Sequence, residues 1–212
     1  MKNAGNEQRA MIRDALVLFA ITLVAGLLLG IVYDITKEPI MEQKAKAKAQ
    51  ACKNVFSVAS SFEPLFEEDG PSAHFVAGLD SNVSIDEVMQ ALDASGNVIG
   101  YVITVTDHEG YGGDIQFSMG ITLERTVNGI SLLSISETPG LGMKAGDVLV
   151  PQFTDRTAQQ FTYTKSGAAN DSEIDAISGA TITTNAVVNG VNGGLLFFDG
   201  VLAEMEGGAV NE

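Results

Sequence analysis

The feature that most constrains this chain is a run of 19 residues without a charged side chain, from Ala15 to Tyr33 (ALVLFAITLVAGLLLGIVY). An α-helix rises about 1.5 Å per residue, so this run would form a helix about 28 Å long, close to the hydrocarbon thickness of a bilayer. Asp14 and Asp34 bracket the run, and Tyr33 suits a membrane interface. The run therefore predicts one transmembrane helix at 15–33, after a short N-terminus at 1–14, which is cytoplasmic when the domain behind the span lies outside the membrane.

A cleaved signal peptide and a buried core helix are the two other interpretations of this run. The run is long for the apolar region of a signal peptide, and no small-x-small cleavage site follows it promptly. We therefore favour an uncleaved anchor. Hydropathy leaves the membrane side of the rest of the chain open, because basic residues both precede and follow the span and large domains cross membranes largely regardless of charge.

Charge is spread unevenly along the chain. Beyond Lys53 there are 22 acidic residues and only four basic ones, which gives this part a net charge of −18. Such a surface repels nucleic acid and anionic lipid, and it would hold a free phosphorylated ligand poorly. Cys52 is the only cysteine, so it cannot form an internal disulfide or a cysteine metal site, and we interpret it as a free thiol. No metal site is predicted.

Hydrophobic patterning behind the anchor predicts a helical stalk at 34–60 and one α+β domain at 61–212. The stretch 37–56 is rich in good helix formers, whereas 60–75 is acidic and predicted to be irregular. In the strand predicted at 115–124, alternation places Ile115, Phe117, Met119, Ile121 and Leu123 on one face. The other predicted elements are strands at 97–107 and 130–136, short strands or edges at 148–153 and 161–164, and a helix at 185–198.

Three stretches rich in small residues could carry chemistry. They are HEGYGGDI (His108–Ile115) between two predicted strands, ETPGLG (Glu137–Gly142) at a strand end, and DAISGAT (Asp175–Thr181) before the last helix. TPGL has the residue order of a type II turn, with Gly140 at the third position. It can be only a turn, but a backbone without side chains also lets a flat ligand such as a flavin ring approach closely.

The SGAT sequence can be simply a helix N-terminus, since Ser and Thr favour such positions. Its threonine, Thr181, nevertheless has a sterically open hydroxyl, because Gly179 and Ala180 precede it. Another enzyme's active site could close around this hydroxyl, and a phosphoryl group placed there would lie near unpaired helix amides. Ser178 can form a local hydrogen bond, and Asp175 is a further acceptor. We assign no catalytic residue, and none to His108, which has no obvious partner.

The order of these motifs behind a membrane span resembles the G subunit of the Rnf electron-transport complex. The chain is also similar, more distantly, to the C subunit of the sodium-pumping NADH:quinone reductase. The resemblance covers nearly the whole length and rests on the span, GYGGDI, ETPGLG and DAISGATITTNAVVNGV. In this family the Asp-x-x-Ser-Gly-Ala-Thr pattern is the signal at which a separate flavin transferase, with FAD as donor, esterifies FMN phosphate to the threonine.

The resemblance implies a mainly antiparallel sheet with flanking helices and an FMN-binding domain outside the cytoplasmic membrane, on a single-pass anchor. It implies covalent FMN on Thr181, with Asp175, Ser178, Gly179 and Ala180 as the signal. Residues expected to contact the flavin ring are Glu137, Thr138, Gly140, Leu141 and Tyr111. The expected partners are the other Rnf subunits and the flavin transferase. The protein would relay electrons in a complex that oxidises ferredoxin, reduces NAD+ and moves Na+ or H+, without being catalytic alone.

Three other functions compete with this interpretation. The chain could be a membrane-anchored sensor whose glycine loops shape a different pocket, and a sensor would carry no covalent chromophore. It could be the flavin carrier of another extracytoplasmic electron-transfer chain. A serine hydrolase using Ser178 is the weakest alternative, because no histidine base is paired with that serine and only His74 and His108 exist.

Overall fold

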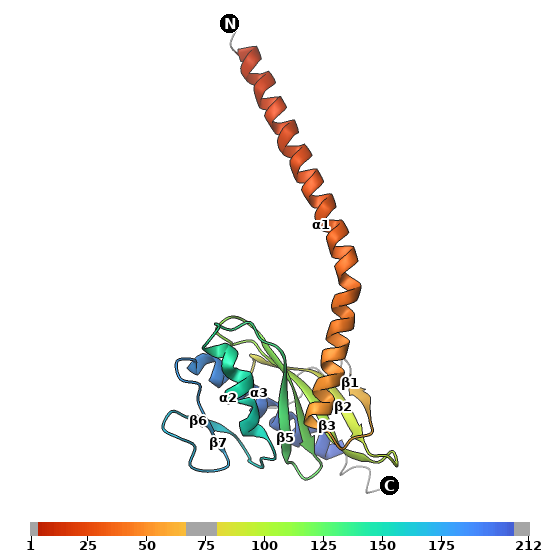
Figure 1. Ribbon diagram of the computed structural model, residues 1–212, viewed down its shortest axis with the longest axis vertical. Coiled ribbons are helices and arrows are strands. Elements are labelled where there is room, and N and C mark those ends of the chain that lie inside the picture. The colour runs from red at the N-terminus through yellow and green to blue at the C-terminus, as the bar shows by residue number, and fades with distance from the viewer. Residues whose placement is uncertain (1–3, 67–79, 206–212) are drawn as a thin grey trace. The chain divides into compact units, whose positions relative to one another are not determined.

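The computed structural model describes residues 4–66 and 80–205, with side chains from residue 9 onward (Figure 1). The chain divides into two compact units, Met1–Lys46 and Ala47–Glu212. Helix α1 (Ala4–Val55) runs without interruption for 52 residues, even though Pro39 lies inside it. It includes the predicted span, whose apolar side chains are all exposed, and most of the predicted stalk. The predicted N-terminal apolar helix is therefore confirmed.

The second unit is built on one antiparallel sheet, as predicted for an α+β domain. Its five strands pair in sequence order, each with the next along the chain. They are β1 (Ser61–Phe66), β2 (Val83–Leu92), β3 (Val98–Asp107), β4 (Ile115–Thr122) and β5 (Val127–Ser134). A separate parallel pair is formed by β6 (Thr162–Thr164) and β7 (Glu173–Asp175).

Helix α3 (Thr181–Phe197) covers one face of this sheet and continues as a π-helical turn, Phe198–Leu202. It carries Ala186, Val187, Val191 and Leu195 into the main core, against Ile103, Val105, Phe117 and Met119 of the central strands. Its glycines permit close approach, because a Cβ on Gly190 would lie 2.9 Å from the Phe117 ring. Close packing thus keeps this glycine-rich segment helical, as the sequence required.

A smaller core lies on the opposite face of the sheet, where the last residues of α1 pack. Cys52, Val55 and Phe56 contact Ala91 of β2 and Val102 of β3. The Cys52 sulfur lies 3.8 Å from that of Met89, and burial raises the pKa of the thiol. The end of α1 is thus part of the folded domain, and Lys48 forms an ion pair with Glu87 of β2.

Several sequence predictions were wrong in detail. Residues 61–66 form β1 instead of irregular chain, while the rest of the predicted irregular stretch, 67–75, lies outside the described residues. Strand β2 was not predicted. The apolar run 148–153 forms helical turns, α2 (Ala145–Val148) and the 3₁₀ segment Val150–Phe153, instead of a strand. Strand β4 ends at Thr122, so Leu123 is exposed instead of sharing the buried face.

Candidate functional site

Two glycine turns of the same kind lie side by side at the start of α3. In the first, the Leu141 amide donates to the Thr138 carbonyl at 3.1 Å, and Gly140 has a φ of 78°. In the second, the Ala180 amide donates to the Ile177 carbonyl at 3.0 Å, and Gly179 also has a φ of 78°. Positive φ at the third position is characteristic of a type II turn, which agrees with the turn predicted for TPGL.

The two turns touch through a side chain. The Leu141 Cδ2 atom lies 3.2 Å from the position that a Cβ on Gly179 would occupy. Gly179 therefore has two reasons to lack a side chain, its positive φ and the close approach of Leu141. The ETPGLG and DAISGAT motifs, 38 residues apart from Glu137 to Asp175, meet in one place.

The third motif joins them through Glu137, whose side chain is buried. Its Oε1 atom accepts a hydrogen bond from the Gly112 amide at 3.1 Å, and its Oε2 atom accepts one from the Thr183 hydroxyl at 2.9 Å. A Cβ on Gly142 would lie 2.6 Å from the Thr183 Oγ1 atom and 2.7 Å from Glu137. One carboxylate thus ties the GYGG loop, the ETPGLG turn and the first turn of α3 together.

The threonines at the start of α3 differ sharply in accessibility. Thr183 and Thr184 are buried, with 1% and 0% of their surface exposed. The Thr183 hydroxyl donates to Glu137, while the Thr184 hydroxyl donates to the Ala180 carbonyl at 2.9 Å and accepts from the Ile177 amide at 3.1 Å. Thr181 is partly exposed, and among the described residues its hydroxyl has no hydrogen-bond partner. Of these three threonines, Thr181 is therefore the one whose hydroxyl is free within the described residues.

Helix α3 begins at Thr181, four residues earlier than predicted, and no side chain caps it. The first helical amide with a backbone acceptor is that of Thr184, which donates to the Ala180 carbonyl. Within the described part of the chain, the amides of Thr181, Ile182 and Thr183 have no acceptor. Such free amides at a helix start favour an anion.

No hydrogen bond within the described residues joins Asp175 or Ser178 of the DAISGAT motif to Thr181. The Asp175 carboxylate accepts a hydrogen bond from the Ala168 amide at 2.6 Å. The Gln152 side chain holds the Asp175 backbone through two hydrogen bonds. Its oxygen accepts one from the Asp175 amide at 2.7 Å, and its nitrogen donates one to the Asp175 carbonyl at 3.1 Å. Ser178 is exposed and has no hydrogen bond within the described residues. Nothing in the sequence around Gln152 signalled this contact.

Two of the three motifs expose an apolar or aromatic side chain. Tyr111 is 69% exposed and Leu141 42% exposed, and Thr138 and Gly140 are exposed as well. Met143 and Ile182, which follow the two turns and are also exposed, were not predicted from the sequence. Met143 lies in the 3₁₀ turn after ETPGLG, and Ile182 is the second residue of α3. Their position directly after two of the motifs could have identified them.

His108 has the partners that the sequence did not reveal. Its Nδ1 atom lies 3.0 Å from the Asp114 carboxylate, and its Nε2 atom lies 3.4 Å from the Ser84 hydroxyl. That hydroxyl donates to Asp86 at 2.9 Å, so its proton is directed away from the histidine. Ser178 is not among these partners, and the arrangement gives no support to a serine hydrolase.

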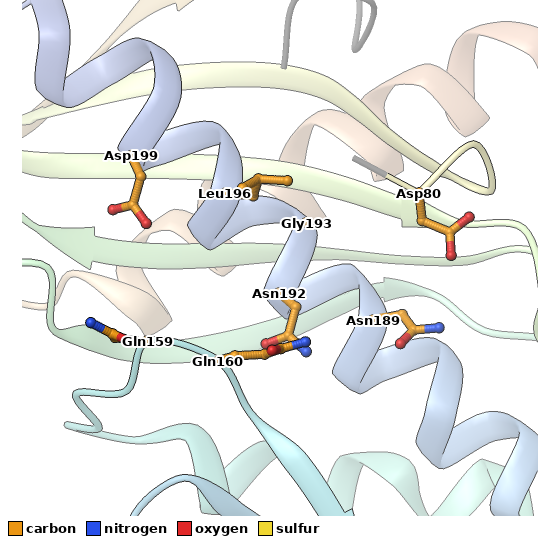
Figure 2. A pocket seen from close by; sticks show the side chains of 8 residues that line it. All are labelled: Asp80, Gln159, Gln160, Asn189, Asn192, Gly193, Leu196 and Asp199. Carbon is orange, nitrogen blue, oxygen red and sulfur yellow. The ribbon is translucent and has the colours of Figure 1, made fainter. Parts of the chain in front are cut away.

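Two of the four basic residues beyond Lys53 are engaged away from Thr181. Arg125 forms a two-point ion pair with Asp199, at 2.6 and 2.7 Å, and Arg156 pairs with Asp171 at 3.0 Å. A cavity of about 380 Å³ lies along the later part of α3, and Figure 2 shows the carboxamides of Gln159, Asn189 and Asn192 and the carboxylate of Asp80 at its edge. Among the described residues, its lining contains two carboxylates and no basic side chain.

Comparison with known proteins gives these motifs a family. A model of the FMN-binding domain matches residues 110–195, and a model of the RnfG N-terminal region matches residues 1–55. The matched domain begins within the GYGG loop and extends beyond the start of α3, so it contains most of the residues described above. These two matches together include α1 and the whole site.

Individual relatives align over most of the chain. The G subunit of the Na(+)-translocating ferredoxin:NAD(+) oxidoreductase complex of Acetobacterium woodii is 31% identical over 186 residues, 87% of this chain and 89% of that protein. The G subunit of the ion-translocating oxidoreductase complex of Methanosarcina acetivorans is 30% identical over 88% of this chain and 94% of its own length. The crystal structure of NqrC from Shewanella oneidensis covers 72% of this chain and 74% of its own, with 17% identity and a TM-score of 0.49. On the extent and identity of the two sequence matches, this chain belongs to the family of G subunits of ion-translocating oxidoreductase (Rnf) complexes.

Proposed function

We propose that this chain is the electron-carrying G subunit of a membrane ferredoxin:NAD+ oxidoreductase complex, and that it holds FMN through a phosphoester to Thr181. The electron-transfer role is supported by its FMN-binding domain and by its relatives, which are named for ion-translocating oxidoreductase complexes, one of them a ferredoxin:NAD(+) oxidoreductase. The observation that carries the attachment site is the accessibility of Thr181 beside two threonines that are buried and hydrogen-bonded.

The charges of the domain explain why a covalent bond would be useful. A free FMN phosphate carries up to two negative charges, and two of the four basic side chains beyond Lys53 are already in ion pairs. A phosphodiester at Thr181 would carry one charge and lie at the free amides that begin α3. The bond also replaces affinity by a tether, which keeps the local concentration of the cofactor high.

The exposed residues of the two turns suit a flat apolar ring. A Cβ on Gly140 would have no atom within 4 Å, so the backbone there is open to a ligand. Leu141 and Tyr111, with Met143 and Ile182 beside them, offer apolar and aromatic surface. Thr138 supplies a hydroxyl at the same turn. We assign Glu137, which the sequence suggested as a ring contact, to holding the loops, because both its oxygens bond within the protein.

Bound FMN supplies one- and two-electron transfer, and the chain's own residues bind and orient it. In this proposal Gly179 and Ala180 leave the Thr181 hydroxyl open to the flavin transferase, and Asp175 and Ser178 complete the signal. Helix α1 anchors the protein in the cytoplasmic membrane among the other Rnf subunits. Its span is long, apolar and unburied, and the extracytoplasmic side of the domain follows from the family resemblance.

Co-expression of the full-length chain with a flavin transferase tests the attachment. The expected product remains fluorescent after denaturing electrophoresis, and its intact mass increases by one FMN less one water, mapped to the peptide that contains Thr181. Thr181→Ala is expected to remove the fluorescence while the protein still folds. Thr157→Ala, which changes an exposed threonine elsewhere in the domain, is the matched control and should keep it. Fluorescence that survives in Thr181→Ala would refute the site.

A further inference from the structure

Asp107 is a carboxylate that the proposed function leaves unused. It is the last residue of β3 and is fully buried. Its Oδ1 atom accepts a hydrogen bond from the Glu109 amide at 2.8 Å, but its Oδ2 atom has no partner within the described residues. Glu137, by contrast, is a buried carboxylate with both oxygens bonded. Native proteins rarely leave a buried polar atom unpaired, so Asp107 requires an explanation.

The surroundings of Asp107 favour its neutral, protonated form. Burial raises the pKa of Asp107 to about 6, and the carboxylates of Glu109 and Asp80 raise it as well. The Glu109 amide and His108 act in the opposite direction, and His108 is itself paired with Asp114. A carboxyl group in this range can gain or lose a proton near physiological pH in response to a modest change in local charge.

Asp107 lies at the base of the loop that belongs to the candidate site. Across the ladder it pairs with Ile115, the first residue of β4. A Cβ on Gly110, inside the loop, would lie 2.9 Å from both Ile115 and the Glu137 carboxylate. Glu137 in turn bonds Gly112 and Thr183, two residues beyond Thr181. A short series of packed groups therefore connects Asp107 to the attachment site.

We propose that Asp107 is a proton-binding site linked to the charge of the cofactor, so that it gains a proton when the site gains an electron. The inference rests on the proposed function. When the site gains an electron from its donor, one proton leaves a hydronium ion of the solvent and forms an O–H bond at the Asp107 Oδ2 atom, to an extent set by pH. Asp107 binds one proton at most, whatever the number of electrons that the site receives. Oxidation returns the electron to the acceptor and the proton to water.

Midpoint potentials of the flavinylated protein, measured between pH 5 and 8, test this link. The midpoint potential of Asp107→Asn should fall less steeply with rising pH than that of the unaltered protein. The difference between the two midpoint potentials should therefore change across this range. Asp147→Asn removes one exposed carboxylate of the same domain and should give a curve parallel to the unaltered one. Parallel curves for Asp107→Asn and the unaltered protein would overturn the proposal.

A second measurement needs no flavin and uses the unmodified Thr181→Ala protein. Its stability to urea is expected to decrease from about pH 4 to pH 6, and this decrease should disappear when Asp107→Asn is added. Asp80→Asn, which removes a neighbouring carboxylate, should instead move the decrease to lower pH. An unchanged decrease in the Asp107→Asn background would show that Asp107 does not bind the proton and would overturn the inference. A preparation that takes up no covalent flavin would instead refute the proposed function.

Discussion

Helices α1 and α3 both contain two glycines four residues apart, and the two pairs have different surroundings. In α3, a Cβ would lie 2.9 Å from the Phe117 ring at Gly190 and 2.6 Å from Met119 at Gly194. In α1, a Cβ on Gly26 or Gly30 would have no atom within 4 Å. Both helices are apolar and long enough to cross a membrane, but the apolar part of α3 is mostly buried in the domain and that of α1 is not.

The comparison shows that composition alone does not separate a core helix from a membrane helix. Glycines at this spacing allow close approach of a neighbour. Helix α3 finds its neighbour in the sheet of the same chain, whereas within the described residues α1 has none along its span. Within the described residues, Gly26 and Gly30 therefore face no atom against which they could pack.

Gly190→Leu in α3 should lower the free energy of unfolding more than any other substitution proposed here. Overpacking against the Phe117 ring should lower the free energy of unfolding by about 3 kcal/mol, beyond what the gain in helix propensity returns. Gly30→Leu in α1 is the matched control, since no atom there would clash. Urea unfolding of the full chain in detergent, followed by circular dichroism, measures both. Equal stability of the two variants would contradict the packing described for α3.

Glu137→Ala tests whether the Glu137 carboxylate anchors the start of α3. It removes the acceptor of the buried Thr183 hydroxyl and of the Gly112 amide, and a stability loss of roughly 2–3 kcal/mol is expected. Thr183→Val, which removes only one of these bonds, should cost about 1 kcal/mol. Hydrogen exchange at the first turn of α3 should accelerate in both variants. Unchanged exchange there would argue against the anchoring role.

Asp107→Asn should stabilise the domain at neutral pH. The folded-state pKa of Asp107, about 6, lies above its ordinary value of 3.8. Protonation of Asp107 therefore stabilises the folded state fully below about pH 4. This stabilisation is lost as the pH rises through 6. At pH 7 the variant should gain roughly 2 kcal/mol. Unfolding free energies at pH 4, 5, 6 and 7 check the sign, and a gain that is equal at all four would contradict it.

Gly26→Leu should have the smallest effect on the chain itself, within about 0.5 kcal/mol. If α1 packs against a helix of another protein of the complex, the same change should reduce co-purification with the membrane complex. Leu27→Ile, an adjacent exposed residue of the span, is the control. Loss of co-purification with Gly26→Leu but not with Leu27→Ile would show that the glycines of α1 pack closely against another protein, as those of α3 pack against the sheet.

Periodic residues made much of the fold predictable, whereas isolated contacts did not. Strands β3 and β4 and helix α3 carry long apolar patterns, and these elements were expected. Strand β2 escaped notice because Asp86 and Glu87 interrupt it, and their partners, Thr106, Gln116 and Lys48, come from other parts of the chain. The run 148–153 was mistaken for a strand because a short apolar segment has no period of its own.

The backbone of the candidate site was predictable in part. TPGL was predicted as a turn, and Gly140 has the positive φ that such a turn requires. The matching turn at Gly179 was not predicted, because SGAT was interpreted as a helix N-terminus. The meeting of the motifs was not predictable in detail. Glu137 joins positions 25 and 46 residues away, and Gln152 holds Asp175 across 23 residues. Such pairings depend on the completed fold, and a single sequence gives no spacing rule for them.

The burial of Cys52 has a practical consequence. The only thiol of the chain is 2% exposed, and its pKa is raised by burial, so it should react slowly with maleimides in the native protein. A single new cysteine placed on an exposed position, such as Met143 or Val58, would then accept a spin label or dye selectively without prior removal of the natural one. Impermeant reagents applied to whole cells could use that handle to determine on which side of the membrane the domain lies.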